Sequence, residues 1–184
     1  ARTFGWTSRE IIRRVWKLEP PTDERVRAIH DRKEALYREI VSRDFPHVDG
    51  ARELIDALRA AGFRLAIGSS APPENVALSI ERLGGTHLFD AVVHGRDVTR
   101  GKPDPQVFLL AAGRLGVSPR FCVVIEDAVP GIEAARRAGM ASVALVSIGR
   151  TEQELRAARP SLLVRSLREL TPERLNRLIE QMAV

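Results

Sequence analysis

Apolar residues in the first 46 positions recur every three or four residues, which is the spacing of an amphipathic helix. Thr7 and Glu10 form a capping box before one such stretch, and Pro20-Pro21 breaks it. The next stretch ends at Phe45-Pro46. The two predicted helices carry the stripes Ile11, Ile12, Val15 and Trp16, and then Val26, Ile29, Leu36 and Ile40. This part of the chain is therefore predicted to be helical throughout.

From residue 47 onward, short apolar runs alternate with helical stretches. The runs predicted to be strands cover residues 63–68, 89–93, 121–125, 142–146 and 162–164. A second capping box, Thr151 and Glu154, opens one of the helices between them. Strands that alternate with helices pair in parallel and are covered by helices on both faces. The sequence therefore predicts an α/β fold with a Rossmann-like parallel sheet, whose ligands bind beyond the carboxyl ends of the strands.

The composition excludes several classes of protein. With 44% hydrophobic and 29% charged residues, the 184-residue chain can bury a core, and no apolar run is long enough to span a membrane. The formal charge is +5, but the arginines are scattered among acids, so nucleic-acid binding is not expected. The single cysteine, Cys122, lies in an apolar run, which favours a buried structural thiol and a reducing cytoplasm.

Two serines directly follow the predicted strand over residues 63–68. Ser69 and Ser70 precede Pro73, which suits the first turn of the next helix. A hydroxyl and free backbone N–H groups at the start of a helix can hold a phosphate. A simple N-cap role for either serine is the alternative.

Lys102 is the last of only three lysines, in a region that otherwise uses arginine. Its compact ammonium group can hold a phosphate oxygen and a carboxylate together, whereas a guanidinium is a broad planar fork. A surface lysine before the proline turn at residues 103–105 is the alternative.

Glu126 and Asp127 follow the predicted strand over residues 121–125. Two adjacent carboxylates at the end of a buried strand are costly unless a cation or hydrogen-bond donors meet them. Oxygen ligands of this kind suit Mg²⁺, which takes one or two protein carboxylates and keeps several waters. Capping of the next helix is the alternative, but two acids exceed what a cap needs.

Taken in this order on successive strand–helix units, these motifs resemble those of the haloacid dehalogenase superfamily, in its β-phosphoglucomutase-like branch with a small helical cap. The matching segments are Leu65-Ala66-Ile67-Gly68-Ser69-Ser70, Gly101-Lys102-Pro103-Asp104-Pro105, and Val123-Val124-Ile125-Glu126-Asp127 with Pro130-Gly131 after it. The resemblance implies that residues 1–46 are the C-terminal part of a helical cap and that residues 47–184 form the α/β core.

The resemblance also implies roles for particular residues. Ser69, with Ser70 beside it, would bind the transferring phosphoryl group, and Lys102 would neutralise that group and the nucleophile. Asp127 would ligate Mg²⁺, with Glu126 as a second ligand or water holder.

Trp6 and Arg9 fall in a cap loop that faces the substrate in relatives. More ordinary roles, packing for Trp6 and solvation for Arg9, are the alternatives.

The chain departs from the family at its first motif. The family's nucleophile is the first aspartate of an Asp-x-Asp pair at the tip of the first strand, and no two aspartates of this chain are two positions apart. We therefore expect that the core lacks its first strand and that the chain as written has no phosphatase turnover. A neighbouring strand should then present an unpaired edge and apolar surface, which a second copy of the chain could cover.

The function implied is a Mg²⁺-dependent phosphatase that acts on a small phosphorylated metabolite through an aspartyl-phosphate intermediate, without nucleic-acid or membrane partners. A sugar-phosphate mutase is the nearest enzymatic alternative, although Ala71-Pro72-Pro73 offers few polar contacts to a sugar. An inactive truncated form, or a pseudoenzyme that only binds a ligand, is the alternative from another class.

Overall fold

The computed structural model describes residues 23–147 and 149–183. The chain divides between Pro46 and His47 into two compact units, and each is described by itself. In the first unit, the helix α2 (Asp23–Arg43) confirms the second predicted helix. Leu36 and Ile40 of its predicted stripe are exposed, at 39% and 65%. The periodicity thus predicts the helix but not what covers it. The earlier predicted helix lies outside the described residues.

The second unit contains the alternating elements that the sequence predicts. Its helices are α3 (Ala51–Ala60), α4 (Pro73–Leu83), α5 (Gln106–Leu115), α6 (Val129–Arg137), α7 (Glu152–Ala157) and α8 (Pro172–Ala183). Its strands are β1 (Ala66–Gly68), β2 (Ala91–Val93), β3 (Val123–Glu126), β4 (Ala141–Leu145) and β5 (Leu162–Val164). The capping box of Thr151 and Glu154 is present at the start of α7.

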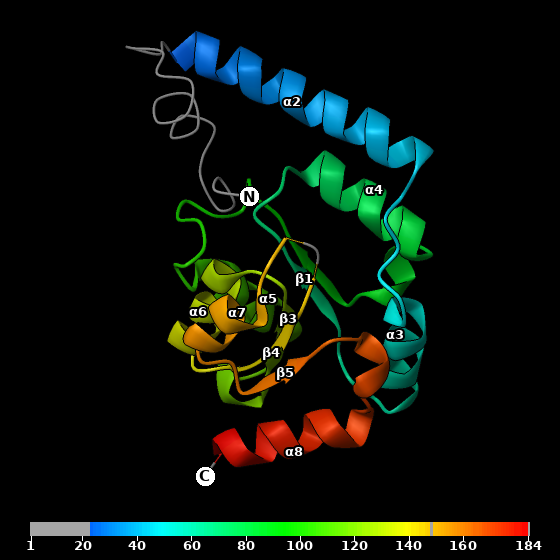
Figure 1. Ribbon diagram of the computed structural model, residues 1–184, viewed down its shortest axis with the longest axis vertical. Helices are drawn as coiled ribbons and strands as arrows, with labels where there is room; N and C mark the ends of the chain where they lie inside the picture. The colour runs from blue at the N-terminus through cyan, green and yellow to red at the C-terminus, as the bar shows by residue number, and fades with distance from the viewer. Residues whose placement is uncertain (1–22, 148, 184) are drawn as a thin grey trace. The chain divides into compact units, whose positions relative to one another are not determined.

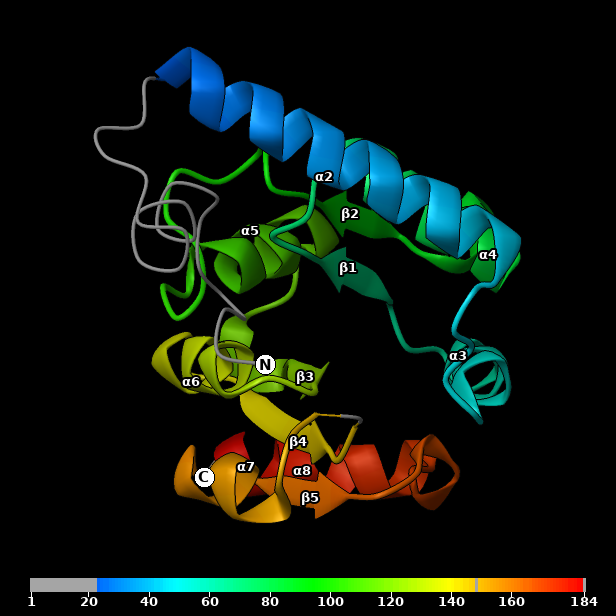
Figure 2. The ribbon, with the colours of Figure 1, turned by 45° about the horizontal axis from the view of Figure 1, so that its top comes forward.

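All strand pairs are parallel, as predicted, but the strands form two sheets rather than one. β1 pairs with β2, and β3, β4 and β5 form the second sheet in that order. Figure 2 shows the two sheets one above the other, with β1 and β3 as the strands that face each other. Within the described part of the chain, neither β1 nor β3 has a strand partner on that side.

Three strands, β1, β2 and β3, begin two or three residues later than the apolar runs suggest. Leu65, inside the run over residues 63–68, donates its backbone N–H to Asp90 Oδ2 at 2.8 Å instead of to a neighbouring strand. Phe121, the first residue of another run, ends a short 3₁₀ turn over Pro119–Phe121. The apolar composition therefore locates these strands, but local hydrogen bonds set where they begin.

Helices cover both faces of the second sheet around its buried central strand, β4. Val143 of β4 packs in a cluster with Leu54 of α3 and Leu175 of α8. The next residue, Ala144, packs with Ile132 of α6 and Leu155 of α7, because successive strand residues point to opposite faces. Figure 1 shows these strands with α8 beyond β5 and with α6 and α7 to one side. α5 packs against β1 and β2.

A cleft of about 710 Å³ lies between β1 and β3. Its lining includes both strands and apolar side chains of α3, α5 and α8. Ile125 of β3, at 36%, and Phe121 before it, at 44%, are exposed although both are large and apolar. The cleft is thus bordered by two unpaired strand edges and lined largely by apolar side chains. In the described part of the chain, none of the helices combines the length and the hydropathy of a membrane span.

Candidate active site

Lys102 links the carboxyl ends of β1 and β3, which border the cleft. Its Nζ donates to the carbonyl oxygen of Gly68 at 3.2 Å and forms an ion pair with Glu126 Oε1. The side chains of Lys102 and Glu126 are only 17% and 11% exposed. The ammonium group also lies 4.6 Å from the ring centroid of Phe108, which is a cation–π contact. The alternative of a solvated surface lysine is therefore excluded.

Both carboxylate oxygens of Glu126 are engaged. Oε1 meets Lys102, and Oε2 accepts the backbone N–H groups of Asp127 and Ala128 at 3.0 and 3.1 Å. These two amides precede α6, whose N-cap position is Ala128 and has no side-chain cap. Glu126 thus holds the lysine in place while it anchors the turn into the helix.

Ser69 lies at the end of β1 and is not an N-cap. The N-cap position of α4 is Pro72, without a side-chain cap, so the capping alternative for the serines is wrong. Ser69 Oγ accepts the N–H of Ala71 at 3.1 Å, and its own N–H donates to the carbonyl of Val93 at 2.9 Å. Ser70 is exposed on the same turn. The arrangement leaves the Ser69 hydroxyl proton available for donation to a ligand.

Asp127 is exposed and has a partner that the sequence analysis missed. Ser147 Oγ donates to Asp127 Oδ2 at 2.9 Å. Ser147 follows β4, so the rule that singled out Ser69, a polar residue just past a strand, would have found it as well. The carboxyl ends of β1, β3 and β4 therefore all contribute polar side chains to the same edge of the core.

The donor set fits Mg²⁺ as a partly hydrated ion. In the described ranges no group of three or more His, Cys, Asp and Glu side chains could enclose a metal. Mg²⁺ commonly binds through one or two carboxylates and completes its octahedron with water and substrate phosphate oxygens. Asp127, exposed at the strand end, has the chemistry for direct ligation, and Glu126 is adjacent but already bound to Lys102.

Two other sequence predictions concern the pair Trp6 and Arg9, and Cys122. Trp6 and Arg9 lie outside the described residues. Cys122 is partly buried just before β3, and burial raises the pKa of its thiol, which agrees with a structural rather than a reactive cysteine.

Comparisons with known proteins agree with this geometry. The model of the haloacid dehalogenase-like hydrolase family matches residues 2–139. A haloacid dehalogenase-like hydrolase domain-containing protein of Arabidopsis thaliana is 34% identical over 158 residues, 84% of this chain and 50% of the relative. A phosphorylated carbohydrates phosphatase of Thermotoga maritima is 30% identical over 142 residues, 76% of this chain and 64% of the relative.

The solved structures include a β-phosphoglucomutase from Clostridium difficile with a TM-score of 0.84. The match covers 99% of this chain and 81% of that one at 22% identity, so the likeness concerns the fold. The chain spans only about half to two thirds of the length of the two curated relatives. With a family model that matches most of its residues, and the strand-end serine, lysine and acid pair brought to one edge, the chain belongs to the haloacid dehalogenase-like hydrolase family.

Proposed function

We propose that this chain carries most of the active site of a Mg²⁺-dependent phosphatase that acts on a small phosphate monoester through an aspartyl-phosphate intermediate. The observation that carries the proposal is the position of Lys102, bound to Gly68 at the end of β1 and to Glu126 at the end of β3. A strand inserted between β1 and β3 would thus have its carboxyl end beside the fixed ammonium group of Lys102. An anionic nucleophile and a phosphoryl group at that tip would both be neutralised by it.

The nucleophile would come from a strand in the cleft between β1 and β3. Both edges that face the cleft lack a strand partner in the described part of the chain, and the lining is apolar. A parallel strand entering there would end beside Lys102 and Ser69, since parallel strands share one carboxyl edge. Such a strand can belong to a longer form of this protein or to a second chain.

The proposed reaction passes through two displacements. A carboxylate oxygen of the added strand attacks phosphorus, so that a new P–O bond forms while the bond to the leaving alcohol breaks. The leaving oxygen takes a proton from the second aspartate of the Asp-x-Asp motif. Water then attacks phosphorus and gives a proton back to the second aspartate, while the bond between phosphorus and the first aspartate breaks, which releases inorganic phosphate and restores the carboxylate.

The described residues would stabilise and orient the phosphoryl group. The Ser69 hydroxyl would donate to one phosphoryl oxygen, and the Lys102 ammonium would face another as well as the nucleophile. Asp127 would ligate Mg²⁺, and the ion would supply positive charge to the phosphoryl group. Ser147 would hold the Asp127 carboxylate in its observed orientation.

We expect the intact enzyme to work in the cytoplasm on a small phosphorylated metabolite.

A phosphatase is favoured over a mutase by the relatives. The Thermotoga maritima relative is named as a phosphatase, which supports this choice, and the match to the β-phosphoglucomutase from Clostridium difficile concerns the fold alone. Release of phosphate from glucose 6-phosphate or p-nitrophenyl phosphate, rather than isomerisation of a sugar phosphate, is the outcome that separates the two.

Strand complementation tests the proposal. The 184-residue chain is assayed with p-nitrophenyl phosphate and Mg²⁺, alone and with an apolar peptide that ends in Asp-x-Asp. We expect no turnover from the chain alone, and turnover with the peptide that disappears when its first aspartate is replaced by asparagine. Turnover by the chain alone that co-purifies with it and vanishes in Asp127→Ala would overturn the requirement for an added strand. Sedimentation of the chain alone, with and without the peptide, shows whether a second copy associates and whether the peptide displaces it.

A further inference from the structure

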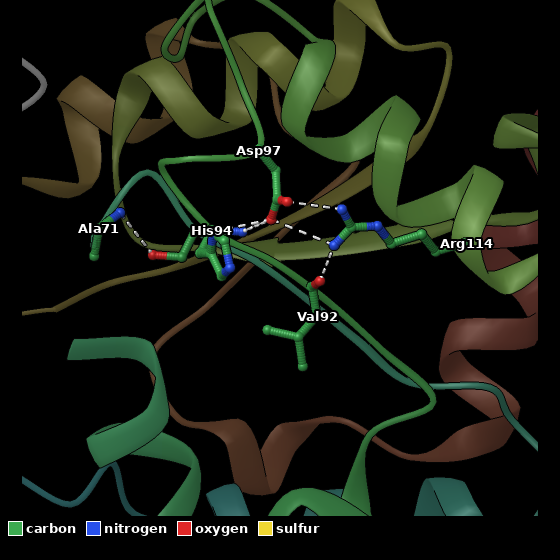
Figure 3. Close-up of polar contacts among 6 residues, drawn as sticks. Ala71, Val92, His94, Asp97 and Arg114 are labelled. Carbon is green, nitrogen blue, oxygen red and sulfur yellow. Dashed lines mark hydrogen bonds and ion pairs between the residues drawn. The ribbon is translucent and has the colours of Figure 1, made fainter. Parts of the chain in front are cut away.

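A second polar cluster lies beside the candidate site, between α5 and the segment that follows β2. Arg114, in the last turn of α5, donates from Nη2 to Asp97 Oδ1 at 2.8 Å and from Nη1 to Asp97 Oδ2 at 3.3 Å. Nη1 also donates to the carbonyl of Val92 in β2. Figure 3 shows the guanidinium between Asp97 and Val92. Arg114 thus ties the loop after β2 both to a helix and to the strand itself.

Asp97 also closes the loop on itself. Its Oδ2 accepts the backbone N–H of His94 at 2.9 Å, and its own N–H donates to the carbonyl of His94 at 2.9 Å. The imidazole Nδ1 of His94 lies 3.0 Å from the same carboxylate oxygen. The Asp97 carboxylate is therefore the common acceptor that fixes the turn over residues 94–97 relative to Arg114.

This turn packs directly against the loop that carries Ser69. The N–H of Gly95 donates to the carbonyl of Ala71 at 2.7 Å, and the N–H of Ser69 donates to the carbonyl of Val93 at 2.9 Å. The approach is close enough that a Cβ at Gly95 would lie 2.5 Å from the carbonyl oxygen of Ser70. Movement of the turn would therefore shift the loop over residues 69–71, because no space separates the two.

We propose that Asp97 and Arg114 are positioning residues, which hold the loop over residues 69–71 in the shape that binds the phosphoryl group. The inference rests on the proposed function, since it assigns a role in that same site. Neither residue is expected to touch the ligand. Their effect passes through the turn over residues 94–97 and the backbone contact between Gly95 and Ala71.

The charge state of Asp97 agrees with this role. Hydrogen bonds from Arg114 and from the backbone N–H of His94 lower the pKa of Asp97 to about 2, so the carboxylate stays ionised through the neutral range. A charged acceptor makes stronger hydrogen bonds than a neutral amide in its place would make.

A second Asp–Arg pair in the chain can serve as a control for the general loss of stability that follows when such a pair is broken. Asp49, just before α3, accepts from Arg168 with both carboxylate oxygens at 2.8 Å. Hydrogen bonding from Arg168 also lowers the pKa of Asp49. This second bidentate pair has the same chemistry, and Asp49 and Arg168 make no hydrogen bond to residues 69–71.

The experiment compares Asp97→Asn with Asp49→Asn in the 184-residue chain, with Arg114→Lys as a milder variant that keeps the charge. Calorimetry measures the binding of inorganic phosphate in the presence of Mg²⁺, and hydrogen exchange follows the amides of Ser69 and Gly95. We expect Asp97→Asn to weaken phosphate binding by roughly two- to thirtyfold, with a smaller loss in Arg114→Lys and none in Asp49→Asn. Exchange of the two amides should accelerate only in the Asp97 and Arg114 variants.

The outcomes separate the two proposals. If the unmodified chain binds phosphate and Asp97→Asn binds it equally well, or if Asp49→Asn loses as much affinity, the positioning role is wrong while the phosphatase site stands. If the unmodified chain binds no phosphate, either alone or with the Asp-x-Asp peptide of the complementation assay, the proposed function fails at its binding step and the positioning role fails with it.

Discussion

The carboxylate of Glu126 occupies the space that a side chain at Gly131 would need. A Cβ at position 131 would lie 2.1 Å from both Cδ and Oε1 of Glu126, far inside any contact distance. Oε1 is also the atom that meets Lys102. The glycine in the first turns of α6 therefore sets how close the acid, and with it the lysine, can come to the helix.

Gly131→Ala should displace Glu126 and loosen its ion pair with Lys102. Overpacking at a tight site costs about 1–3 kcal/mol of unfolding free energy, and urea denaturation measures it. Glu126→Asp in the same chain should restore part of the loss, because the shorter side chain withdraws its carboxylate from the added methyl group.

Gly113→Ala is the control for this substitution. Gly113 lies within α5, and a Cβ there meets nothing within 4 Å. Alanine should therefore stabilise the chain by about 0.5–1 kcal/mol, which is the ordinary effect of replacing glycine inside a helix. If Gly131→Ala behaved like Gly113→Ala, the close contact with Glu126 would be wrong.

Lys102 and Glu126 should couple in a double-mutant cycle. Lys102→Met leaves the largely buried Glu126 carboxylate without its cation, although two backbone N–H groups still reach it. We expect a loss of about 1–3 kcal/mol in unfolding free energy. Lys102→Met combined with Glu126→Gln should lose less than the sum of the single variants. Strict additivity in urea denaturation would mean that the ion pair contributes nothing to stability.

Local patterns were sufficient to predict the order of elements. The strand over residues 162–164 and the start of α4 at Pro73 follow from an apolar run and a helix-starting proline. The capping box of Thr151 and Glu154 was also predicted, because its two hydrogen bonds join residues only three apart. Ser69 and Glu126 could be singled out because each follows a predicted strand. Lys102 could be singled out because it is a rare lysine in a region that otherwise uses arginine.

Contacts between distant segments could not be predicted. The absent Asp-x-Asp motif led us to expect an unpaired strand edge, but which strands carry it, and hence the division into two sheets, depends on pairing between distant segments that no local pattern encodes. Likewise, the Asp97–Arg114 pair joins residues 17 apart, and each looks like an ordinary surface charge in the sequence. The contact between Gly131 and Glu126 depends on side-chain direction, which periodicity does not give.

Cys122 should react slowly in the folded chain. It is partly buried, its Sγ lies 3.6 Å from the carbonyl of Ser118, and burial raises the pKa of the thiol, so less thiolate is present at neutral pH. We expect alkylation by iodoacetamide to be about tenfold slower than in the urea-unfolded chain. Mass spectrometry of timed samples measures both rates. Equal rates in the folded and unfolded states would show that the thiol is accessible and unperturbed.

The Asp97–Arg114 pair should make the free energy of unfolding depend on pH in the acid range. The pKa of Asp97 falls from its ordinary 3.8 to about 2 in the folded chain, so the folded state binds its proton less readily than the unfolded state. The resulting stabilisation is complete above the unfolded pKa and is lost as the pH falls from about 4 to about 2. The difference in unfolding free energy between the wild-type chain and Asp97→Asn should be flat near neutral pH and shrink over that window. A difference that stays constant into the acid range would contradict the lowered pKa.

The roles of Lys102 and Asp127 should separate in the enzyme completed by its nucleophile-bearing strand. Asp127→Asn removes charge from the proposed metal ligand but keeps an oxygen, so its activity should recover in part as Mg²⁺ is raised. Lys102→Arg should lose on the order of a hundredfold in kcat and should not recover, because the planar guanidinium cannot replace a point charge between Gly68, Glu126 and the phosphoryl group. Steady-state kinetics across a Mg²⁺ titration measure both variants. Near-full activity of Lys102→Arg would show that any cation suffices at this position, and the catalytic role of the lysine would then have to be withdrawn.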